Sequence, residues 1–230
     1  MKRKRKIFKH EKIDIGYEDL DANTTTTGRT YSTPDGKSYP SVTTVLSILN
    51  EHFIKAWRER VGEEEANRIS GVASNRGTRV HSIVEKYLKN EDTTEFLPNI
   101  RQSLENLKTV LDPNIGKIFG LEVPLFSHHL GVAGRCDCIA EYNGVPSIID
   151  FKTSRYIKKK EKITNYFAQG AAYSIMWEER TGMPITQLVT IISVDNSEPQ
   201  VFIEHRDNWV RPLLDTIDQY IEENSSVQLV

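Results

Sequence analysis

The sequence has little cysteine, no long apolar run and no excess of charge of either sign. Its 230 residues include two cysteines, which are too few for a four-cysteine zinc site or an iron–sulfur cluster. No run of 18 or more apolar residues occurs, so no transmembrane helix is expected. The 30 basic and 32 acidic residues give a formal net charge of −2. This balance argues against a surface coated with positive charge and leaves room for a basic groove.

The two cysteines, Cys136 and Cys138, flank Asp137. Residues at i and i+2 on a strand are expected to share a face, and they do not form a normal disulfide with each other. Free cysteine is usually buried, so both are interpreted as small core residues in a reducing cytosol. The N-terminus also lacks an apolar signal-peptide core.

The most informative stretch covers residues 131–152 and predicts two strands joined by a turn at Asn143-Gly144. The first strand carries Asp137, and the second carries Asp150 and Lys152, which alternate onto one face. If the hairpin pairs about its turn, Asp137 reaches the same end. Two carboxylates this close repel unless a cation lies between them, and a hard divalent ion such as Mg²⁺ suits carboxylate oxygens.

The pattern of an aspartate, a β-turn spacer and Asp-x-Lys resembles the PD-(D/E)XK nuclease superfamily, which has the restriction-endonuclease-like fold. The segments around Asp137 and Asp150, a Gln169-x-x-x-Tyr173 pair and a helical His81 upstream are similar to its RecB-type branch. Within that branch the chain is most similar to the group of the mitochondrial genome maintenance exonuclease and its bacteriophage relatives. The resemblance covers roughly residues 40–196, and Cys136 stands where many members have proline.

This resemblance implies a set of site residues. His81, Asp137, Asp150 and the Phe151 carbonyl are expected to hold Mg²⁺, for which Mn²⁺ would substitute, and Lys152 is expected to act on the attacking water together with the two aspartates. Glu122 is expected near the metal, with a salt-bridged strand residue as its alternative. Expected substrate contacts come from several elements: Gly77, Gln169, Tyr173, Ser154, Arg155, Lys158 and Trp57.

Two of these assignments have plain alternatives. Val80, Ile83, Val84, Tyr87 and Leu88 form an apolar stripe at helical spacing within residues 74–89, and a histidine on such a helix can simply be packed. Trp57 can likewise be a packed residue of an amphipathic helix. The lysine run at 158–160 leaves the catalytic strand directly, although such runs are often only solvated loops.

The predicted fold class is α/β, with a mixed central sheet flanked by helices and a core order of helix, three strands, helix, strand. Residues 1–70 are expected to form an N-terminal extension over the active-site side, and residues 71–230 the nuclease domain. The basic residues 1–12 are interpreted as a frayed terminus or as an arm that touches phosphates. The other expected elements are a linker at 24–27, a hairpin at 29–39, a helix capped by Ser41, helices at 100–111, 165–180 and 209–223, and strands at 118–127, 188–194 and 200–205.

By resemblance, the expected function is a Mg²⁺-dependent exonuclease acting on single-stranded DNA with a free end, without an iron–sulfur cluster or a membrane partner. The alternatives are a duplex-end resecting exonuclease, an endonuclease, or a non-catalytic DNA-binding module of the same fold. A nucleotide or sugar enzyme is disfavoured because the sequence has no Gly-rich phosphate loop of the Walker type. The expected compartment is a bacterial or phage-infected cytoplasm; acidic residues soon after residue 10 disfavour a mitochondrial presequence.

Overall fold

A six-stranded mixed sheet forms the centre of the computed structural model, which describes residues 5–225. The strand order is β1-β5-β6-β7-β8-β9; β1–β5 and β7–β8 pair in parallel, and the other neighbours are antiparallel. The strands are β1 (Lys9–His10), β5 (Ile115–Ser127), β6 (Val132–Tyr142), β7 (Val145–Ser154), β8 (Gln187–Val194) and β9 (Gln200–His205).

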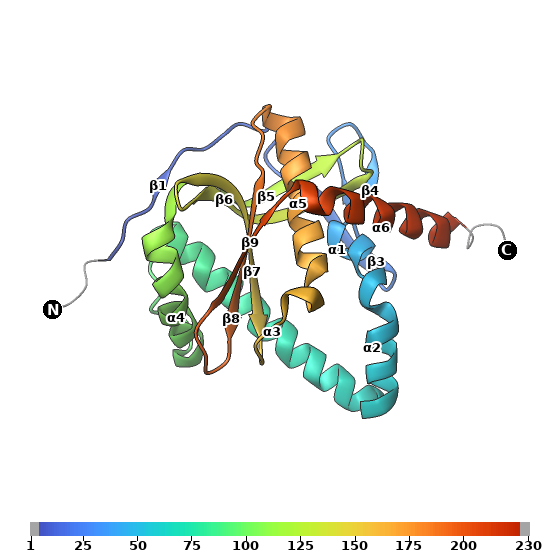
Figure 1. The fold of residues 1–230 in the computed structure, drawn as a ribbon, viewed down its shortest axis with the longest axis horizontal. Helices are drawn as coiled ribbons and strands as arrows, with labels where there is room; N and C mark the ends of the chain where they lie inside the picture. Colours follow the sequence, from blue (N-terminus) through green and yellow to red (C-terminus); the bar gives the residue numbers. More distant parts are fainter. Residues whose placement is uncertain (1–4, 226–230) are drawn as a thin grey trace.

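Helices cover both faces of this sheet (Figure 1). The apolar stripes of α3 and α4 pack on one face, and α1, α5 and α6 pack on the other. The helices are α1 (Val42–Leu46), α2 (Ile48–Val61), α3 (Glu63–Leu88), α4 (Pro98–Asn114), α5 (Thr164–Thr181) and α6 (Asp207–Ser225), with a short 3-10 turn at Lys160–Lys162. The order α3/α4, β5-β6-β7, α5, β8 confirms the predicted restriction-endonuclease-like core.

The hairpin of β6 and β7 forms around the predicted turn. Asn143 and Gly144 have φ values of 53° and 78°, and two successive positive φ angles match the twist of a tight two-residue hairpin. The register runs from Tyr142 opposite Val145 to Cys138 opposite Ile149 and stops there. β6 and β7 therefore part just before Asp137 and Asp150.

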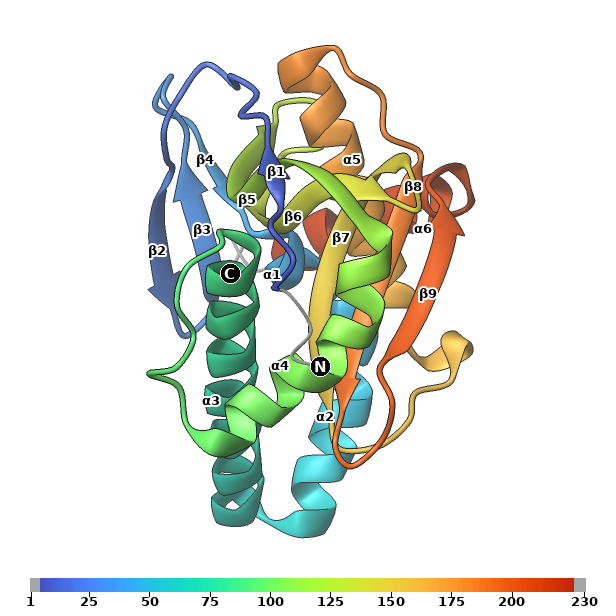
Figure 2. The same ribbon diagram turned by 90° about the vertical axis from the view of Figure 1, so that its left-hand side faces the viewer.

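A second, three-stranded sheet lies beside the first and contains β2 (Asp21–Thr25), β3 (Gly28–Ser32) and β4 (Ser38–Pro40). Figure 2 shows this small sheet at the left of the molecule. It joins the main sheet through a bridge between Ser41 and Ala133. The Ser41 side chain also caps α1, because its Oγ accepts the N–H of Thr44 at 2.9 Å, as predicted.

The helices α2 and α3 meet in a V that extends beyond the main sheet (Figure 1). No residue of α2 is buried, and Phe53 and Ile54 are largely exposed. The buried residues of α3 lie in its second half, apart from Ala66. The predicted domain boundary at residue 70 falls inside α3, which runs without a break past it. No helix of the described residues is long and apolar enough to span a membrane.

The basic N-terminal segment is neither frayed nor a free arm over the part that the structure describes; residues 1–4 lie outside it. Lys6 Nζ donates to the Ile115 carbonyl at 2.6 Å and to that of Asp112, while Arg5 donates to the Glu91 carbonyl. These carbonyls terminate or follow helices, where a cation is favourable. Lys9 and His10 then pair with β5. The described basic residues that looked like a phosphate-binding arm, Arg5, Lys6 and Lys9, therefore attach the chain to backbone groups of the fold.

Three further expectations were wrong. Residues 24–25 belong to β2, and 26–27 form its turn, so this segment is not a linker. Leu49 was expected on the apolar face of the helix capped by Ser41, but that helix ends at Leu46, and Leu49 lies in α2 and is exposed. Cys136 and Cys138 do not share a face: the first packs beneath α5 and the second beneath α3 and α4. Both are buried and free.

Candidate active site

A cleft of about 490 Å³ opens where β6 and β7 part. The second half of α3 forms one wall, and β3, α1 and the segment between β4 and α1 form another. Strands β5, β6 and β7 form the floor together with α5. The lining residues are Arg29, Tyr31, Ser41, Thr43, Gly77, Thr78, His81, Ser82, Glu85, Glu122, Gly134, Arg135, Asp137, Lys152, Gln169 and Tyr173.

Asp137 links three elements of this cleft. Its Oδ2 accepts the backbone N–H of Phe151 at 2.8 Å, which replaces a ladder bond that the diverging strands no longer make. The same oxygen lies 3.5 Å from Nδ1 of His81 on α3. The carboxylate therefore fixes the opening between β6 and β7 and faces the imidazole predicted as a metal ligand.

Glu122 lies across from Asp137, because Leu121 pairs with Cys138 and Val123 pairs with Cys136. Its φ of 51° is left-handed, an unfavourable conformation for a residue with a side chain, of the kind that concentrates at functional sites. Burial, with the nearby charges of Asp137 and Glu85, raises the pKa of Glu122 to about 7. The strained backbone thus holds the partly buried Glu122 carboxyl group beside that of Asp137, which costs free energy of folding.

These irregular positions also explain why the cysteines occupy opposite faces. Side chains along β6 do not alternate strictly between the two faces of the sheet from Cys136 to Cys138, and the irregularity lies at Asp137, opposite Glu122. A local irregularity of this kind re-aims a side chain, as β-bulges beside active sites do. The prediction assumed a regular strand through Asp137, and the sequence carries no glycine or proline there to indicate otherwise.

Lys152 is held by three groups. Its Nζ lies 2.5 Å from Oδ1 of Asp150, 3.3 Å from Oε1 of Gln169 and 5.1 Å from the ring centre of Tyr166. Burial acts to lower the pKa of Lys152, but the Asp150 and Asp137 carboxylates outweigh it and raise that pKa. The lysine therefore carries its positive charge into the cleft, as predicted from the Asp-x-Lys spacing.

Asp150 is the most buried acidic group of the site. Its side chain is 5% exposed, and burial, with Asp137 and against the opposing effect of Lys152, raises its pKa. One oxygen contacts Lys152, whereas Oδ2 is buried and has no hydrogen-bond partner. An unpartnered buried carboxylate oxygen is costly, and a bound cation is one way of satisfying it.

The donor set of the cleft fits a divalent metal. One ligand atom each from His81, Glu122 and Asp137 lies within 4.8 Å of the others; Asp150 is not part of this group, although its free oxygen is a hard donor buried nearby behind Lys152. Carboxylate oxygens suit Mg²⁺ and Mn²⁺, and imidazole is acceptable to Mn²⁺ as a ligand. His81, Glu122 and Asp137 would hold the ion; the contribution of Asp150, which is not among the residues lining the cleft, stays a prediction. The role of the Phe151 carbonyl stays a prediction.

Gln169 and Tyr173 both line the cleft, one turn apart on α5. Gln169 contacts Lys152, and Tyr173 packs against Gly134 so closely that a Cβ there would lie 2.8 Å from the tyrosine hydroxyl. Gly134 therefore admits the Tyr173 ring. Gly77 also lines the cleft, and a Cβ at that position would make only an ordinary contact with Thr153 at 3.7 Å.

Four predicted substrate residues do not line the cleft. Ser154 is buried, and its hydroxyl bonds the Tyr156 carbonyl at 2.6 Å; the backbone N–H of Lys158 bonds Gln200 at 2.7 Å. Arg155 is exposed on the same loop, and Trp57 is half-buried on α2. Contact between these residues and a substrate stays a prediction.

Sequence reasoning missed the wall contributed by Arg29, Tyr31 and Thr43. These residues lie about 100 positions before the catalytic strands, in a segment interpreted only as a hairpin and a capped helix. No motif marks them, because their position depends on the bridge from Ser41 to Ala133. Arg135 also lines the cleft; it belonged to the quoted Gly-Arg-x-Asp segment without being assigned a role.

The chain is similar in sequence to curated exonucleases. Mitochondrial genome maintenance exonuclease 1 of Homo sapiens is 29% identical over 126 residues, which cover 50% of this chain and 36% of that protein. The Mus musculus protein of the same name is 28% identical over 140 residues, or 56% of this chain and 40% of its own length. The matches thus span well under half of these relatives. No protein-family model matches the chain.

A crystal structure of a Eubacterium rectale protein, described as a candidate exonuclease, aligns with a TM-score of 0.46 and 16% identity. It covers 64% of this chain and 65% of that one. The sequence similarity confirms the resemblance drawn from the motif residues and agrees with a PD-(D/E)XK nuclease-like family. The RecB-type branch stays a prediction.

Proposed function

We propose that this protein is a Mg²⁺-dependent nuclease that hydrolyses phosphodiester bonds in DNA. The observation that carries the proposal is the convergence of His81, Asp137 and Lys152 in one cleft at the point where β6 and β7 part, with Asp150 behind Lys152. A two-carboxylate, one-lysine set beside an imidazole suits a cation and a phosphate together. The relatives named exonucleases support this reading.

The bound metal and the side chains of the cleft have different roles in this proposal. Mg²⁺, when bound, supplies positive charge at the phosphate and lowers the pKa of water. Lys152 remains protonated beside Asp150, so its ammonium group orients a water molecule and offsets charge developing on the phosphate. This favours the orienting role over that of a free base. Gln169 and Tyr166 fix the position of the ammonium group.

Positive groups line the cleft beyond the lysine. Arg29 and Arg135 both face it, and Arg135 is oriented by its 2.9 Å bond to the Glu122 carbonyl and by an ion pair with Asp19. Phosphates are bound mainly through such cations. A net charge of −2 is compatible with this arrangement, because only a few positive groups have to face the strand, and a bound cation would offset the acidic Glu85, Glu122 and Asp137 of the cleft.

We propose single-stranded DNA with a free end as the substrate. The names of the relatives support exonuclease action, and α2, which meets α3 in the V, presents exposed Phe53, Ile54 and Lys55. Exposed aromatic and basic side chains together suit unstacked bases and their backbone. A duplex-end exonuclease and an endonuclease are the alternatives that share this site.

The decisive experiment pairs a metal-free gel shift with a cleavage assay on linear DNA with and without Mg²⁺. Binding without metal and cleavage only with metal are expected. Binding without cleavage at any divalent ion concentration contradicts the enzyme and leaves a DNA-binding module. Absence of both contradicts the assignment to nucleic acid altogether.

A further inference from the structure

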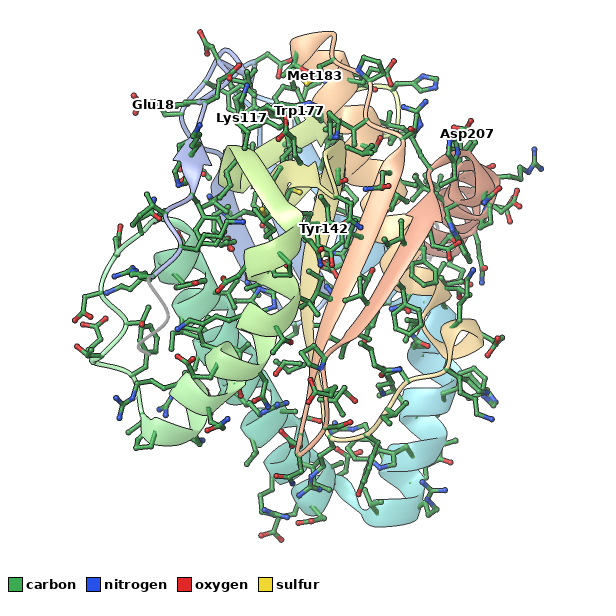
Figure 3. The ribbon with its side chains drawn as sticks, turned by 60° about the vertical axis from the view of Figure 1, so that its left-hand side comes forward. Glu18, Lys117, Tyr142, Trp177, Met183 and Asp207 are labelled. Carbon is green, nitrogen blue, oxygen red and sulfur yellow. The ribbon has the colours of Figure 1, made fainter. Side chains whose placement is uncertain are left out.

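A second pocket, of about 1000 Å³, adjoins the cleft. It lies between the N-terminal segment and β5, with Trp177 of α5 at its base. Figure 3 shows Glu18 and Trp177, which both line it, at the upper end of the molecule. Glu122 and Arg135 line both spaces, so the pocket opens beside the proposed catalytic residues.

The N-terminal segment creates this pocket by leaving the sheet edge. It pairs with β5 at Lys9 and His10, the N–H of Glu11 bonds the Ile118 carbonyl at 2.8 Å, and Tyr17 returns to bond the Pro124 carbonyl at 3.1 Å. No backbone hydrogen bond joins residues 12–16 to β5 in the described part of the chain. Among the described residues, β5 residues 119–123 therefore have no partner strand on the pocket side, and the Glu122 carbonyl accepts a hydrogen bond from Arg135.

The lining has the chemistry of a site for a flat, partly polar ring. Half-buried Tyr17 supplies aromatic surface, the buried Phe119 and Trp177 rings lie beneath it, and Ile13 and Ile15 supply aliphatic surface. The β5 backbone, with which no described segment pairs here, offers polar groups at the edge of such a ring. Lys12 and Lys89 lie among the lining residues and carry positive charge. The acidic Asp14, Glu18 and Glu122 also line the pocket, so its walls are mixed in character, and its volume is within the range of ligand pockets.

We propose that this pocket holds a nucleobase next to the bond that is cut. The inference rests on the proposed nuclease function. A nucleobase is the expected occupant because of where the pocket lies. A DNA strand whose phosphate lies at Asp137 and Lys152 has its neighbouring base within reach of the wall that the two spaces share, formed by Glu122 and Arg135. Stacking on aromatic side chains is tolerant of base identity, so the pocket recognises an unstacked base without selecting a sequence.

The test compares linear single-stranded oligonucleotides that carry one abasic residue, moved stepwise along the strand. Affinity is measured without divalent metal, and kcat/KM is measured with Mg²⁺. One abasic position is expected to weaken binding roughly 5- to 100-fold, the equivalent of about 1–3 kcal/mol for one stacked base. The same position relative to the cut is expected to lower kcat/KM.

Pocket variants connect this effect to the site. Ile13→Trp fills the pocket. This variant is expected to bind intact DNA as weakly as the wild type binds the abasic strand, and its affinity for the abasic strand should be no lower. Ile13→Ala keeps the pocket open and is expected to retain part of the difference, so a folding failure of the larger variant leaves a second test. Ile7→Trp, at a largely exposed position of the same segment outside the pocket, is the matched control and should behave as wild type.

The outcomes separate this inference from the function on which it rests. Cleavage with no sensitivity to any abasic position, or an unchanged abasic effect in Ile13→Trp, overturns the base pocket and leaves the nuclease intact. That result would assign the open β5 edge to something other than DNA, such as an added peptide strand. An abasic effect on binding without cleavage overturns the nuclease and leaves the pocket.

Discussion

The Asp137 carboxylate accepts the N–H of Phe151 at 2.8 Å, at the point where β6 and β7 have stopped pairing. This bond lets the strands separate without leaving a buried donor unsatisfied, which would cost about 1–3 kcal/mol. It also orients Asp137 toward His81. The same carboxylate therefore stabilises the separation of β6 and β7 and takes part in the candidate site.

Lys152→Ala is expected to slow DNA cleavage by at least ~10²-fold while leaving DNA affinity near normal, because the ammonium group acts on the reacting atoms. The measurement is single-turnover cleavage beside a metal-free gel shift. Lys108→Ala is the matched control, since Lys108 pairs with Glu105 on α4 outside the cleft. Full activity in Lys152→Ala would contradict the catalytic assignment.

His81→Ala is expected to raise the Mg²⁺ concentration for half-maximal cleavage with little change in the melting temperature. The His81 side chain is 31% exposed and lines the cleft, so its removal leaves no large core cavity. His129→Ala, in the exposed turn after β5, serves as control. An unfolded variant whose surviving fraction keeps the wild-type metal response would show a packed histidine instead.

Mg²⁺ or Mn²⁺ is expected to raise the melting temperature of the wild type, and chelation is expected to reverse the rise. A ligand at 100 times its Kd stabilises the folded state by about 2.7 kcal/mol. Asp150→Asn replaces the unpartnered buried Oδ2 by an amide and is expected to lose most of this shift. Asp215→Asn on α6, outside the cleft, should keep it. An equal shift in both variants would place the ion elsewhere.

Tyr166→Leu is expected to lower kcat more than it raises KM, because the ring 5.1 Å from Lys152 Nζ positions that ammonium group and is not among the residues lining the cleft. Cation–π contacts of this kind contribute about 0.5–2 kcal/mol, so the expected loss is several-fold. Tyr166→Phe keeps the ring and should restore the wild-type rate. A phenylalanine variant as slow as the leucine variant would show that the hydroxyl matters instead.

Much of the catalytic hairpin could be predicted from local sequence. The Asn143-Gly144 turn sets the register, and the register fixes which residues meet at its open end. The Asp150–Lys152 pair then follows from strand alternation over two residues. Helical spacing placed His81 correctly beside a buried stripe. These features depend on short-range geometry, which a single sequence encodes directly.

The rest depends on long-range packing that carries no local signal. Gly120 and Pro124 flank Glu122 and mark an irregular strand, but they do not reveal its left-handed conformation or that Cys136 and Cys138 lie on opposite faces of the neighbouring strand. Arg29 reaches the cleft because a bridge joins Ser41 to Ala133. The charges of Arg5 and Lys6 indicated phosphate contact equally well, since the sequence does not reveal the carbonyl groups that they meet.

The last prediction concerns the need for a DNA end. A linear single strand is expected to be degraded, whereas a closed circle of the same sequence should persist, because a circle has no end to enter a site with α3 as one wall and β3 and α1 as the other. α2 buries no residue, so completing the core does not account for its position. Its exposed Phe53 and half-buried Trp57 are available to unstacked bases. Initial rates on the two substrates, at equal nucleotide concentration, make the comparison.

Control experiments distinguish the requirement for a DNA end from the preference for single-stranded DNA. A circle linearised at one site should become a substrate, which excludes a sequence effect. Phe53→Ala is expected to weaken the affinity for linear single strands several-fold, and Ile221→Ala, at an exposed position of α6, should not. Equal degradation of circle and linear strand would contradict the end requirement and favour an endonuclease. Blunt duplex cut as readily as a single strand would contradict the strand preference, because stacking on exposed aromatic side chains requires unpaired bases.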